Sequence, residues 1–173
     1  MMMHTTLEQL RELRLHGMVA GLTEQLTSTG LSGMSFEERL ALLVERELHW
    51  RSDKKRERLL KEAKLKYPQA AIEDLDSRAG RGLDRQVVMS LALGHWVSAG
   101  HSVLITGPTG AGKSWLACAL AHQAARSGFS VLYVRAARLF DELQVAHGDG
   151  SFARRLTQLA KLDLLVIDDF AIS

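Results

Sequence analysis

The feature that most constrains this chain is a glycine-rich segment between an apolar run and an alanine-rich run. Residues 107–114 read GPTGAGKS and match the pattern G-x-x-x-x-G-K-[ST] at every fixed position. The preceding residues 101–106 predict a short buried strand, and the following residues 115–126 predict a helix. Strand, glycine loop and helix in this order are the context in which the pattern binds phosphate. The sequence therefore predicts an α/β core built around a phosphate-binding loop.

The residue types of this loop indicate how it would bind a nucleotide. Its glycines let backbone N–H groups approach phosphate oxygens, and the start of the following helix adds partial positive charge. Lys113 can reach the β- and γ-phosphates, and the Ser114 hydroxyl can ligate Mg²⁺. The alternative is a glycine-rich turn that binds nothing. The expected cofactors are ATP and Mg²⁺, and the expected phosphate-binding residues are Gly107, Pro108, Thr109, Gly110, Ala111, Gly112, Lys113 and Ser114.

Two adjacent carboxylates follow a second apolar run. Residues 164–167 predict a short buried strand, and Asp168 and Asp169 come directly after it. A carboxylate at the end of a strand near such a loop can hold Mg²⁺, so Asp168 is assigned the Walker B role beside Ser114. Asp169 could orient and deprotonate the attacking water; the alternative is that it caps a loop or lies in solvent. By this hypothesis Lys113 and Asp169 are the catalytic residues.

The composition excludes several classes of protein. A single cysteine, Cys118, rules out a disulfide framework and favours a reducing compartment. The seven histidines show no metal-ligand spacing. No apolar run approaches the roughly 20 residues that a membrane span needs, and Glu8 and Arg11 lie where a signal peptide would be apolar. We therefore expect a cytoplasmic protein that does not bind membranes.

The chain divides into three predicted parts. Residues 1–66 show helical spacing of apolar residues, and residues 67–82 contain proline and glycine among mixed charges, which predicts a linker. Residues 83–173 alternate predicted strands and helices, which implies a parallel, doubly wound sheet. The elements expected in this third part are helices at 84–97, 115–126, 136–146 and 152–162 and strands at 101–106, 130–134 and 164–167.

The helical N-terminal region has two helix-start signals and a basic run. Thr5 with Glu8 and Ser35 with Glu38 form capping boxes, and Gly17 is expected to interrupt the first helix. Its apolar residues are too few for a core of its own, so it is expected to pack against something else, such as another copy. Basic residues gather between positions 51 and 66, where they could follow DNA phosphates or form a solvated helix face. The candidate DNA contacts in this run are Lys54, Lys55 and Arg58.

Six short segments together make a more specific pattern than the loop alone. They read LRELRLHGM at 10–18, FEERL at 36–40, YPQA at 67–70, RGLDR at 81–85, LITGPTG at 104–110 and LVIDDF at 165–170. With them the chain resembles the IstB-type helper ATPases of bacterial insertion-sequence transposition. These are relatives of the DnaC-type helicase loaders within the AAA+ ATPases, and the resemblance covers essentially the whole chain.

The resemblance implies a P-loop AAA+ core that is incomplete at its C-terminal end and follows an all-helical N-terminal region. Proteins of this family hydrolyse ATP to ADP and phosphate, and copies assemble on double-stranded DNA and remodel it for a cognate transposase. The same comparison places residues 136–147 and 152–162 in a helical insertion that faces DNA. Candidate contacts there are Arg138, Phe140, Arg154 and Arg155, with core packing as the alternative for Phe140 and Phe152.

Three other functions stay open at this point: a DnaC-type helicase loader, a truncated remnant that does not turn over ATP, and a small-molecule P-loop kinase. The family pattern continues past Asp169 with a sensor strand, an arginine finger and a lid, and these 173 residues contain none of them. The sensor strand lies between the P-loop strand and the Walker B strand in that pattern. We therefore expect a fragment or a truncated product with exposed strand edges. It would bind ATP poorly, because a gap would separate Ser114 from Asp168.

Overall fold

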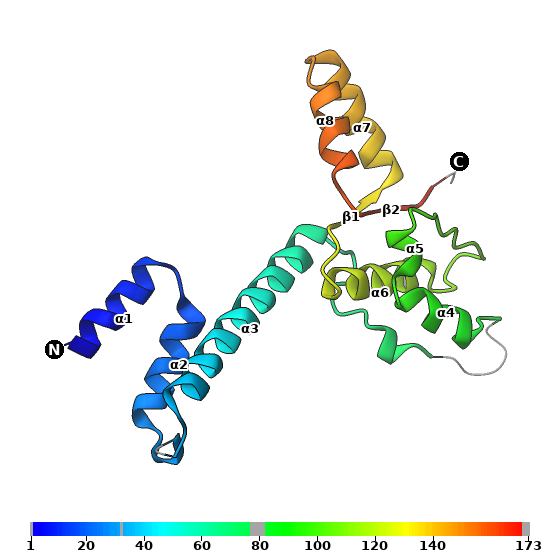
Figure 1. Ribbon diagram of the computed structural model, residues 1–173. Helices are drawn as coiled ribbons and strands as arrows, with labels where there is room; N and C mark the ends of the chain where they lie inside the picture. Colours follow the sequence, from blue (N-terminus) through cyan, green and yellow to red (C-terminus); the bar gives the residue numbers. More distant parts are fainter. Residues whose placement is uncertain (1, 32, 77–81, 171–173) are drawn as a thin grey trace. The chain divides into compact units, whose positions relative to one another are not determined.

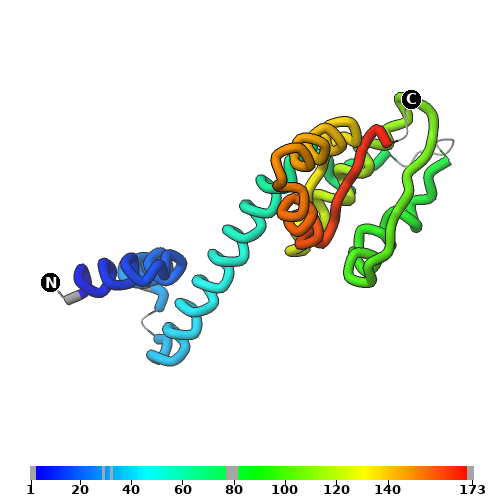
Figure 2. Tube along the Cα trace, turned by 90° about the horizontal axis from the view of Figure 1, so that it is seen from above, coloured from blue at the N-terminus to red at the C-terminus, as the bar shows by residue number. Residues whose placement is uncertain are grey.

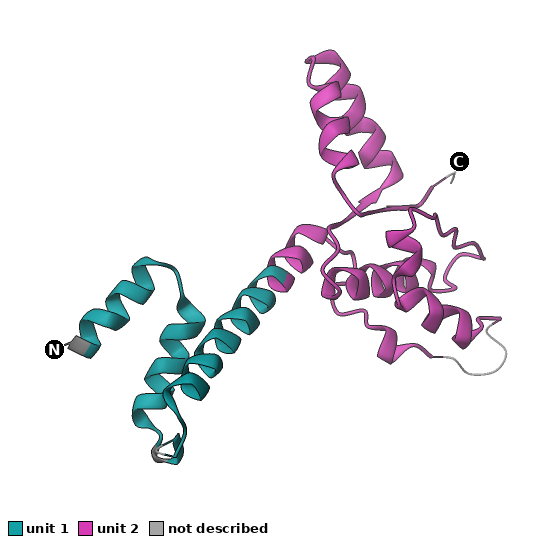
Figure 3. Cartoon of the chain, in the orientation of Figure 1, with its two compact units in different colours: residues 1–55 teal, residues 56–173 magenta. Residues whose placement is uncertain are grey.

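A computed structural model of the chain describes residues 2–31, 33–76 and 82–170. The chain forms two compact units, Met1–Lys55 and Arg56–Ser173 (Figure 3). The division falls within helix α3 (Phe36–Ala63), whereas the predicted boundary follows residue 66. The domain roles attached to that boundary stay predictions, and the two units are described one at a time.

The first unit is helical, as the sequence predicts (Figure 1). It contains α1 (Met2–Glu12), α2 (His16–Thr27), the short 3₁₀ helix η1 (Thr29–Leu31) and the first part of α3. The break between α1 and α2 comes at Arg14, which has a positive φ of 58°. The expected interruption at Gly17 is therefore wrong, because Gly17 lies inside α2.

The two predicted capping boxes have different outcomes. At the start of α3 the Ser35 N–H donates to Glu38 Oε2 at 2.7 Å, and the Glu38 N–H donates to Ser35 Oγ at 3.2 Å. These reciprocal bonds satisfy two N–H groups that the helix itself leaves free, and the predicted box is confirmed. The box at Thr5 and Glu8 is wrong, because α1 already begins at Met2.

Helices α2 and α3 approach each other closely in the first unit. Gly17 and Gly21 are buried, and the Met18 N–H donates to Glu47 Oε2 at 3.1 Å. Glu47 is only 6% exposed, and its other carboxylate oxygen accepts from Arg51 at 2.7 Å. Burial acts to raise the pKa of Glu47, but these hydrogen bonds outweigh it and lower the pKa.

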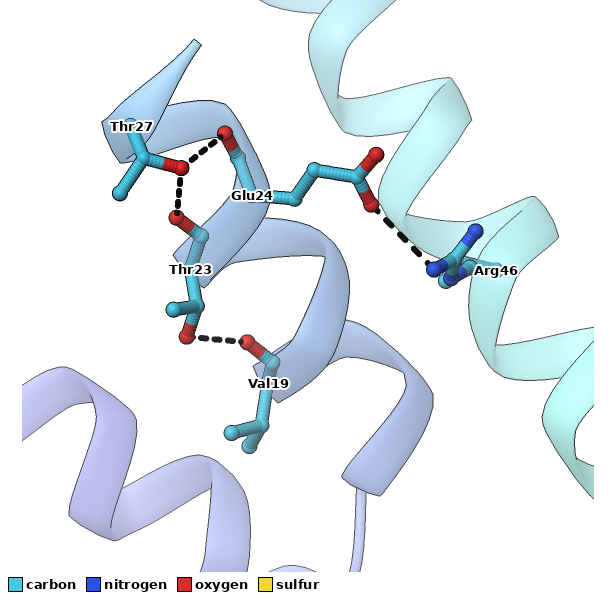
Figure 4. A network of polar contacts seen from close by, with 5 residues as sticks. All are labelled: Val19, Thr23, Glu24, Thr27 and Arg46. Carbon is cyan, nitrogen blue, oxygen red and sulfur yellow. Dashed lines mark hydrogen bonds and ion pairs between the residues drawn. The ribbon is translucent and has the colours of Figure 1, made fainter.

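A second polar link between the same helices is more exposed. Arg46 on α3 pairs with Glu24 on α2 at 3.2 Å, while the hydroxyls of Thr23 and Thr27 bond to carbonyls of α2 (Figure 4). Among the described residues of this unit the buried ones are Gly17, Gly21 and Glu47. The expectation that the region lacks an apolar core of its own is confirmed.

The second unit combines a small parallel sheet with helices. Strand β1 (Val131–Arg135) pairs with β2 (Leu164–Asp168), and Arg135 lies opposite Asp168 in the register. Helix α6 (Lys113–Arg126) packs against both strands. Between β1 and β2 the chain forms α7 (Ala136–Gly148) and α8 (Phe152–Ala160), which lie side by side (Figure 1). The remaining helices are η2 (Ile72–Asp74), α4 (Arg85–Ala92) and α5 (His95–Ser98).

The core of this unit forms around α6. One cluster joins Leu59 and Ala63, from the end of α3, to three alanines of α6 and to Val131. A second cluster joins Tyr133 and Val88 to the other buried side of α6, and it includes Ala70 and Ile72. The first half of the predicted linker is therefore packed into the core, while its residues 77–81 lie outside the described part of the chain.

Two predicted elements differ from the structure. The helix expected over 84–97 is broken into α4 and α5 by Gly94, which has a φ of 77°. The strand expected over 101–106 is wrong: the segment forms no helical turns (Figure 2) and is not a strand, and Leu104 is 85% exposed. A strand needs a neighbour for its backbone hydrogen bonds, and no described residue pairs with this segment.

The structure is thus a mixed α/β fold, mostly helical, with a two-stranded parallel sheet in its described part. The order of strands and helices after residue 112 matches the sequence prediction. No described helix is long and apolar enough to cross a membrane.

Replacing Gly17 by alanine should weaken the packing of α2 on α3. A Cβ at this position would lie 2.6 Å from the Arg46 carbonyl oxygen and 2.6 Å from Glu47 Cα, and backbone atoms cannot turn aside as a side chain can. We expect a loss of about 1–3 kcal/mol, typical of overpacking. Amide hydrogen exchange of peptides from α2 would measure it.

The matched control is Gly33→Ala, because a Cβ there would meet nothing within 4 Å. Exchange in α2 should stay unchanged in this variant. Equal protection of α2 in Gly17→Ala and in the unaltered chain would contradict the close helix contact.

Candidate functional site

The glycine loop has a backbone that non-glycine residues rarely adopt. Gly110 and Gly112 have φ angles of 79° and 89°, in the left-handed region. Gly112 caps the N-terminus of α6, so Lys113 and Ser114 form the first turn of that helix. The free N–H groups of this turn lie at the end of the loop, as the sequence predicts for a phosphate site.

Lys113 bends back over its own loop. Its Nζ donates to the carbonyl oxygens of Gly107 at 2.8 Å and Pro108 at 2.9 Å. These partners are neutral, and an ammonium binds a charged phosphate oxygen more strongly than a carbonyl. A nucleotide phosphate can therefore replace them.

Ser114 and Asp168 are 54 positions apart in sequence and meet in the structure. The Ser114 hydroxyl donates to Asp168 Oδ1 at 2.9 Å. The expected gap between the two residues is therefore wrong. Helix α6 packs directly on β1 and β2, which brings its first turn to the carboxyl end of β2 without an intervening strand.

The Asp168 carboxylate accepts several hydrogen bonds. Tyr133, on the neighbouring strand, donates its hydroxyl to Oδ2, while Ser114 bonds to Oδ1. Partial burial acts to raise the pKa of Asp168, but the bonds from Tyr133, Ser114 and the Asp169 backbone outweigh it and lower the pKa. Burial and the contact with Asp168 raise the pKa of Tyr133. Asp168 is therefore ionised at neutral pH, and Tyr133 is its neutral donor.

Asp169 lies at the turn after β2 with a positive φ of 55°. Its Oδ2 is 3.7 Å from Arg135 Nε, and both side chains are largely exposed. Asp169 thus lies in solvent, as the alternative to the catalytic role expects, and its role as the base stays a prediction. Its carboxylate is open to water and pairs with an arginine at the end of β1.

A cavity of about 1000 Å³ joins these groups. Residues 101–107 line one part of it and residues 163–170 line another, with Ser114 and other residues of α6 between them. Lys66 and Tyr67, which follow α3, line it as well. The cavity thus contains the loop, the lysine and both carboxylates that the sequence analysis selected.

The donor set fits a magnesium ion bound with a nucleotide. A hydroxyl and a carboxylate oxygen converge at Ser114 and Asp168, and Mg²⁺ prefers oxygen ligands from one or two carboxylates together with phosphates. Among the described residues no cluster of three or more histidine, cysteine or acidic side chains could hold a metal by itself. Phosphate oxygens and water would supply the rest of the coordination of a cation at this site.

Comparison with known proteins identifies the family of this chain. A family model described as IstB-like ATP-binding protein matches residues 8–173. The chain belongs to the IstB-like ATP-binding proteins. The resemblance inferred from the six sequence segments is confirmed.

Relatives of this IstB-like chain come from several bacterial insertion sequences. An ATP-binding protein of insertion sequence IS1162 from Pseudomonas fluorescens is 55% identical over 173 residues, which are 100% of this chain and 75% of the relative. The insertion-sequence ATP-binding protein y4pL of Sinorhizobium fredii is 45% identical over 172 residues, 99% of this chain and 70% of the relative. The IS21 ATP-binding protein of Pseudomonas aeruginosa is 29% identical over 167 residues, 96% of this chain and 63% of the relative.

The DNA candidates of the IstB-like chain lie in two other places. Arg138 on α7 and Arg155 on α8 both bond to Glu142, at 3.1 Å and 2.7 Å. The hydrogen bonds from Arg138 and Arg155 lower the pKa of Glu142. They outweigh partial burial, which acts to raise it. One carboxylate thus offsets part of the charge of two candidate arginines, whereas the Arg154 side chain is exposed.

The other candidates lie on α3, where Lys54, Lys55 and Arg58 have exposed side chains. Arg58 Nε is 4.0 Å from Glu62 Oε1, and Lys54 Nζ is 6.0 Å from the Trp50 ring centroid. Phe140 is 54% exposed, so core packing is not its role, while Phe152 packs edge-on against His147. Whether any of these residues contacts DNA stays a prediction.

Sequence reasoning missed four residues of the site: Tyr133, Arg135, Lys66 and Tyr67. A signal existed for Arg135, because the carboxyl ends of neighbouring parallel strands meet at one edge of a sheet. For Tyr133 the signal was weaker, since an aromatic residue in a strand usually packs in the core. Lys66 ends the basic run at 51–66 and Tyr67 begins the YPQA segment, but neither pattern pointed to the nucleotide site.

Lys113→Ala should remove most of the affinity for ATP. Lys113 is the basic residue of the loop, and a hydrogen bond to a charged group contributes about 1.5–3 kcal/mol, which corresponds to roughly 10- to 100-fold in affinity. Calorimetric titration with ATP and Mg²⁺ would measure the loss. Lys161→Ala, at an exposed lysine after α8, is the matched control and should bind like the unaltered chain. Equal affinity in both variants would contradict the assignment.

Proposed function

We propose that this chain is an ATP- and Mg²⁺-binding helper of DNA transposition that assembles on target DNA and remodels it for a partner transposase. The observation that carries the nucleotide part is the hydrogen bond between Ser114 and Asp168 at the end of the glycine loop. Membership in the IstB-like family and the names of its insertion-sequence relatives support the transposition part. They favour this function over a helicase loader or a small-molecule kinase.

Each residue of the site has a proposed task. The loop N–H groups and Lys113 bind and orient the β- and γ-phosphates, which holds the terminal phosphoryl group in place. Ser114 and Asp168 would hold Mg²⁺, which neutralises charge on the phosphates when it is bound. Asp169 would accept a hydrogen bond from the attacking water and take its proton, and Arg135 keeps that carboxylate in position.

The finer fold that we propose is an AAA+ core with a doubly wound sheet. The cavity supports it, because extended residues 101–107 and strand β2 line it from two sides. Within the described residues β2 pairs with β1 alone, which leaves its other edge without a ladder partner. A further strand paired with that edge would extend the two-stranded sheet toward the doubly wound sheet that we propose.

The helical region is proposed to mediate self-association or partner contact, with residues 67–82 as connection and residues 83–173 as ATPase core. Exposed apolar side chains support this role of the first unit. On α3 they recur every four residues, at Phe36, Leu40, Val44 and Leu48. Such a stripe on a helix with no apolar core beneath it suits an oligomer contact.

The nucleotide part is tested with the purified chain, ATP and Mg²⁺. We expect Mg²⁺-dependent ATP binding, because Ser114 and Asp168 are already together and the gap on which the expectation of poor binding rested is absent. Phosphate release in the presence of duplex DNA should stay below about one per minute, since an arginine finger supplies a factor of about 10³–10⁵ and none is expected in these residues.

Two outcomes would contradict these statements. Equal ATP affinity in Mg²⁺ and in EDTA would contradict the proposed metal–nucleotide site. Asp168→Ala is the reference variant, because it should lose the Mg²⁺ dependence of ATP binding. Steady turnover faster than about one per minute would mean that the missing finger is not limiting.

DNA binding should be electrostatic and largely independent of sequence. Its affinity should fall steeply with salt, and changing Lys54, Lys55 and Arg58 together to glutamine should reduce the slope by about one unit per lost phosphate contact. Fluorescence anisotropy with a labelled duplex, repeated over a range of salt, would measure it. The companion triple variant neutralises Arg138, Arg154 and Arg155. A slope that changes only in this second variant would move the DNA site to α7 and α8.

A further inference from the structure

We propose that Tyr133 is a positioning residue of the Mg²⁺–nucleotide site: its hydroxyl holds the Asp168 carboxylate so that one oxygen faces Ser114 and the cation. This inference rests on the proposed function, since it needs Asp168 to be a magnesium ligand. It adds a residue that lies outside both sequence motifs, on a strand that does not carry the phosphate-binding loop.

The sheet register places Tyr133 where it can reach Asp168. Tyr133 lies opposite Val166, and Arg135 lies opposite Asp168. Because side chains alternate along a strand, Tyr133 and Asp168 share one face of the sheet as diagonal neighbours. A diagonal of this kind spans about 7–8 Å between strands, a distance that a tyrosine side chain bridges.

The packing around Tyr133 fixes its ring in the core, and its hydroxyl is bonded to Asp168. The residue is 7% exposed, and its ring packs in the core with Leu116 and Cys118 of α6 and with Val88 of α4. The ring is therefore fixed by apolar contacts from several elements. Its hydroxyl, at the end of that fixed ring, donates to Asp168 Oδ2.

The two oxygens of Asp168 are thus distinguished. Oδ2 is bound to Tyr133 from within the core, and Oδ1 faces Ser114 in the cavity. When a cation enters, Ser114 and Oδ1 can turn their lone pairs toward it while Tyr133 keeps Oδ2 in place. Partners that orient a ligating carboxylate in this way typically change metal affinity by about 10- to 100-fold.

Two positively charged side chains near Asp168 could compete with Mg²⁺ for its carboxylate, which gives the bond from Tyr133 a function. Lys66 lines the same cavity, and its charge attracts the Asp168 carboxylate. Arg135 ends the neighbouring strand and pairs with Asp169. A carboxylate free to rotate could pair with one of these cations instead of Mg²⁺. A neutral donor such as Tyr133 holds Asp168 without competing for its charge.

The test compares ADP affinity of the chain over a range of Mg²⁺ concentrations and in EDTA, measured by calorimetry. Tyr133→Phe keeps the ring and removes only the hydroxyl. We expect its apparent Mg²⁺ affinity to be about tenfold weaker, at the low end for residues that orient a ligand. ADP affinity in EDTA should be unchanged, and high Mg²⁺ should restore full ADP binding, which a misfolded protein would not show.

The matched control is Thr157→Val, which also deletes one hydroxyl in the same unit. The Thr157 hydroxyl donates to the Ala153 carbonyl within α8 at 2.9 Å, and Thr157 does not line the cavity. Its Mg²⁺ dependence should match that of the unaltered chain. Replacing Tyr133 by p-aminophenylalanine keeps an N–H donor at the same place and should restore the Mg²⁺ affinity that phenylalanine loses.

Three results would overturn the inference, and each is distinct from failure of the proposed function. The first is an unchanged Mg²⁺ dependence of ADP binding in Tyr133→Phe. The second is a loss of ADP affinity in this variant that is as large in EDTA as in Mg²⁺. The third is an Mg²⁺ affinity that p-aminophenylalanine does not restore. If the phenylalanine variant does not fold, the p-aminophenylalanine variant still tests the inference. Weak Mg²⁺ binding by this variant in its folded form would contradict the role of Tyr133 as a donor to Asp168. If the unaltered chain itself shows no effect of Mg²⁺ on ADP binding, it is the proposed function that fails.

Discussion

The contact of helix α6 with both strands is the interaction on which the rest of the second unit depends. Most buried residues of α6 are small, among them Cys118, Ala121 and Ala125, so the helix can lie close to the sheet. This approach buries the apolar side of β1 and brings the first turn of α6 to the end of β2. A larger side chain on this side of α6 would separate the glycine loop from the carboxylate that it needs.

The packing of α6 on the sheet also positions the polar side chains at the carboxyl end of β2. Asp168 is held from the core side by Tyr133 and from the cavity side by Ser114, while Asp169 points to solvent and pairs with Arg135. Two neighbouring carboxylates therefore have different surroundings. One is fixed and ionised, as a metal ligand must be, and the other is open to water, as a base must be. The proposed division of roles follows from this difference.

The first unit is held together in a different way. Its helices approach through two glycines and through Glu47, which bonds to the backbone of one helix and to Arg51 on its own. The apolar side chains of α3 stay exposed instead of filling a core. Backbone contact and one buried carboxylate set the geometry of this unit, and its apolar surface is left for an association that the proposed function requires.

The sequence by itself determined the local structures: the glycine loop that begins α6, the Ser35 capping box, the two strands of the sheet and the carboxylates at the end of β2. Each depends on neighbouring residues, whose types and spacing are visible in a single chain. Only the tertiary structure decided that residues 101–106 form no strand, because a strand requires a partner that local sequence cannot supply. It alone also joined Ser114 to Asp168 and added Tyr133, since contacts between residues far apart in sequence depend on how helix and sheet pack.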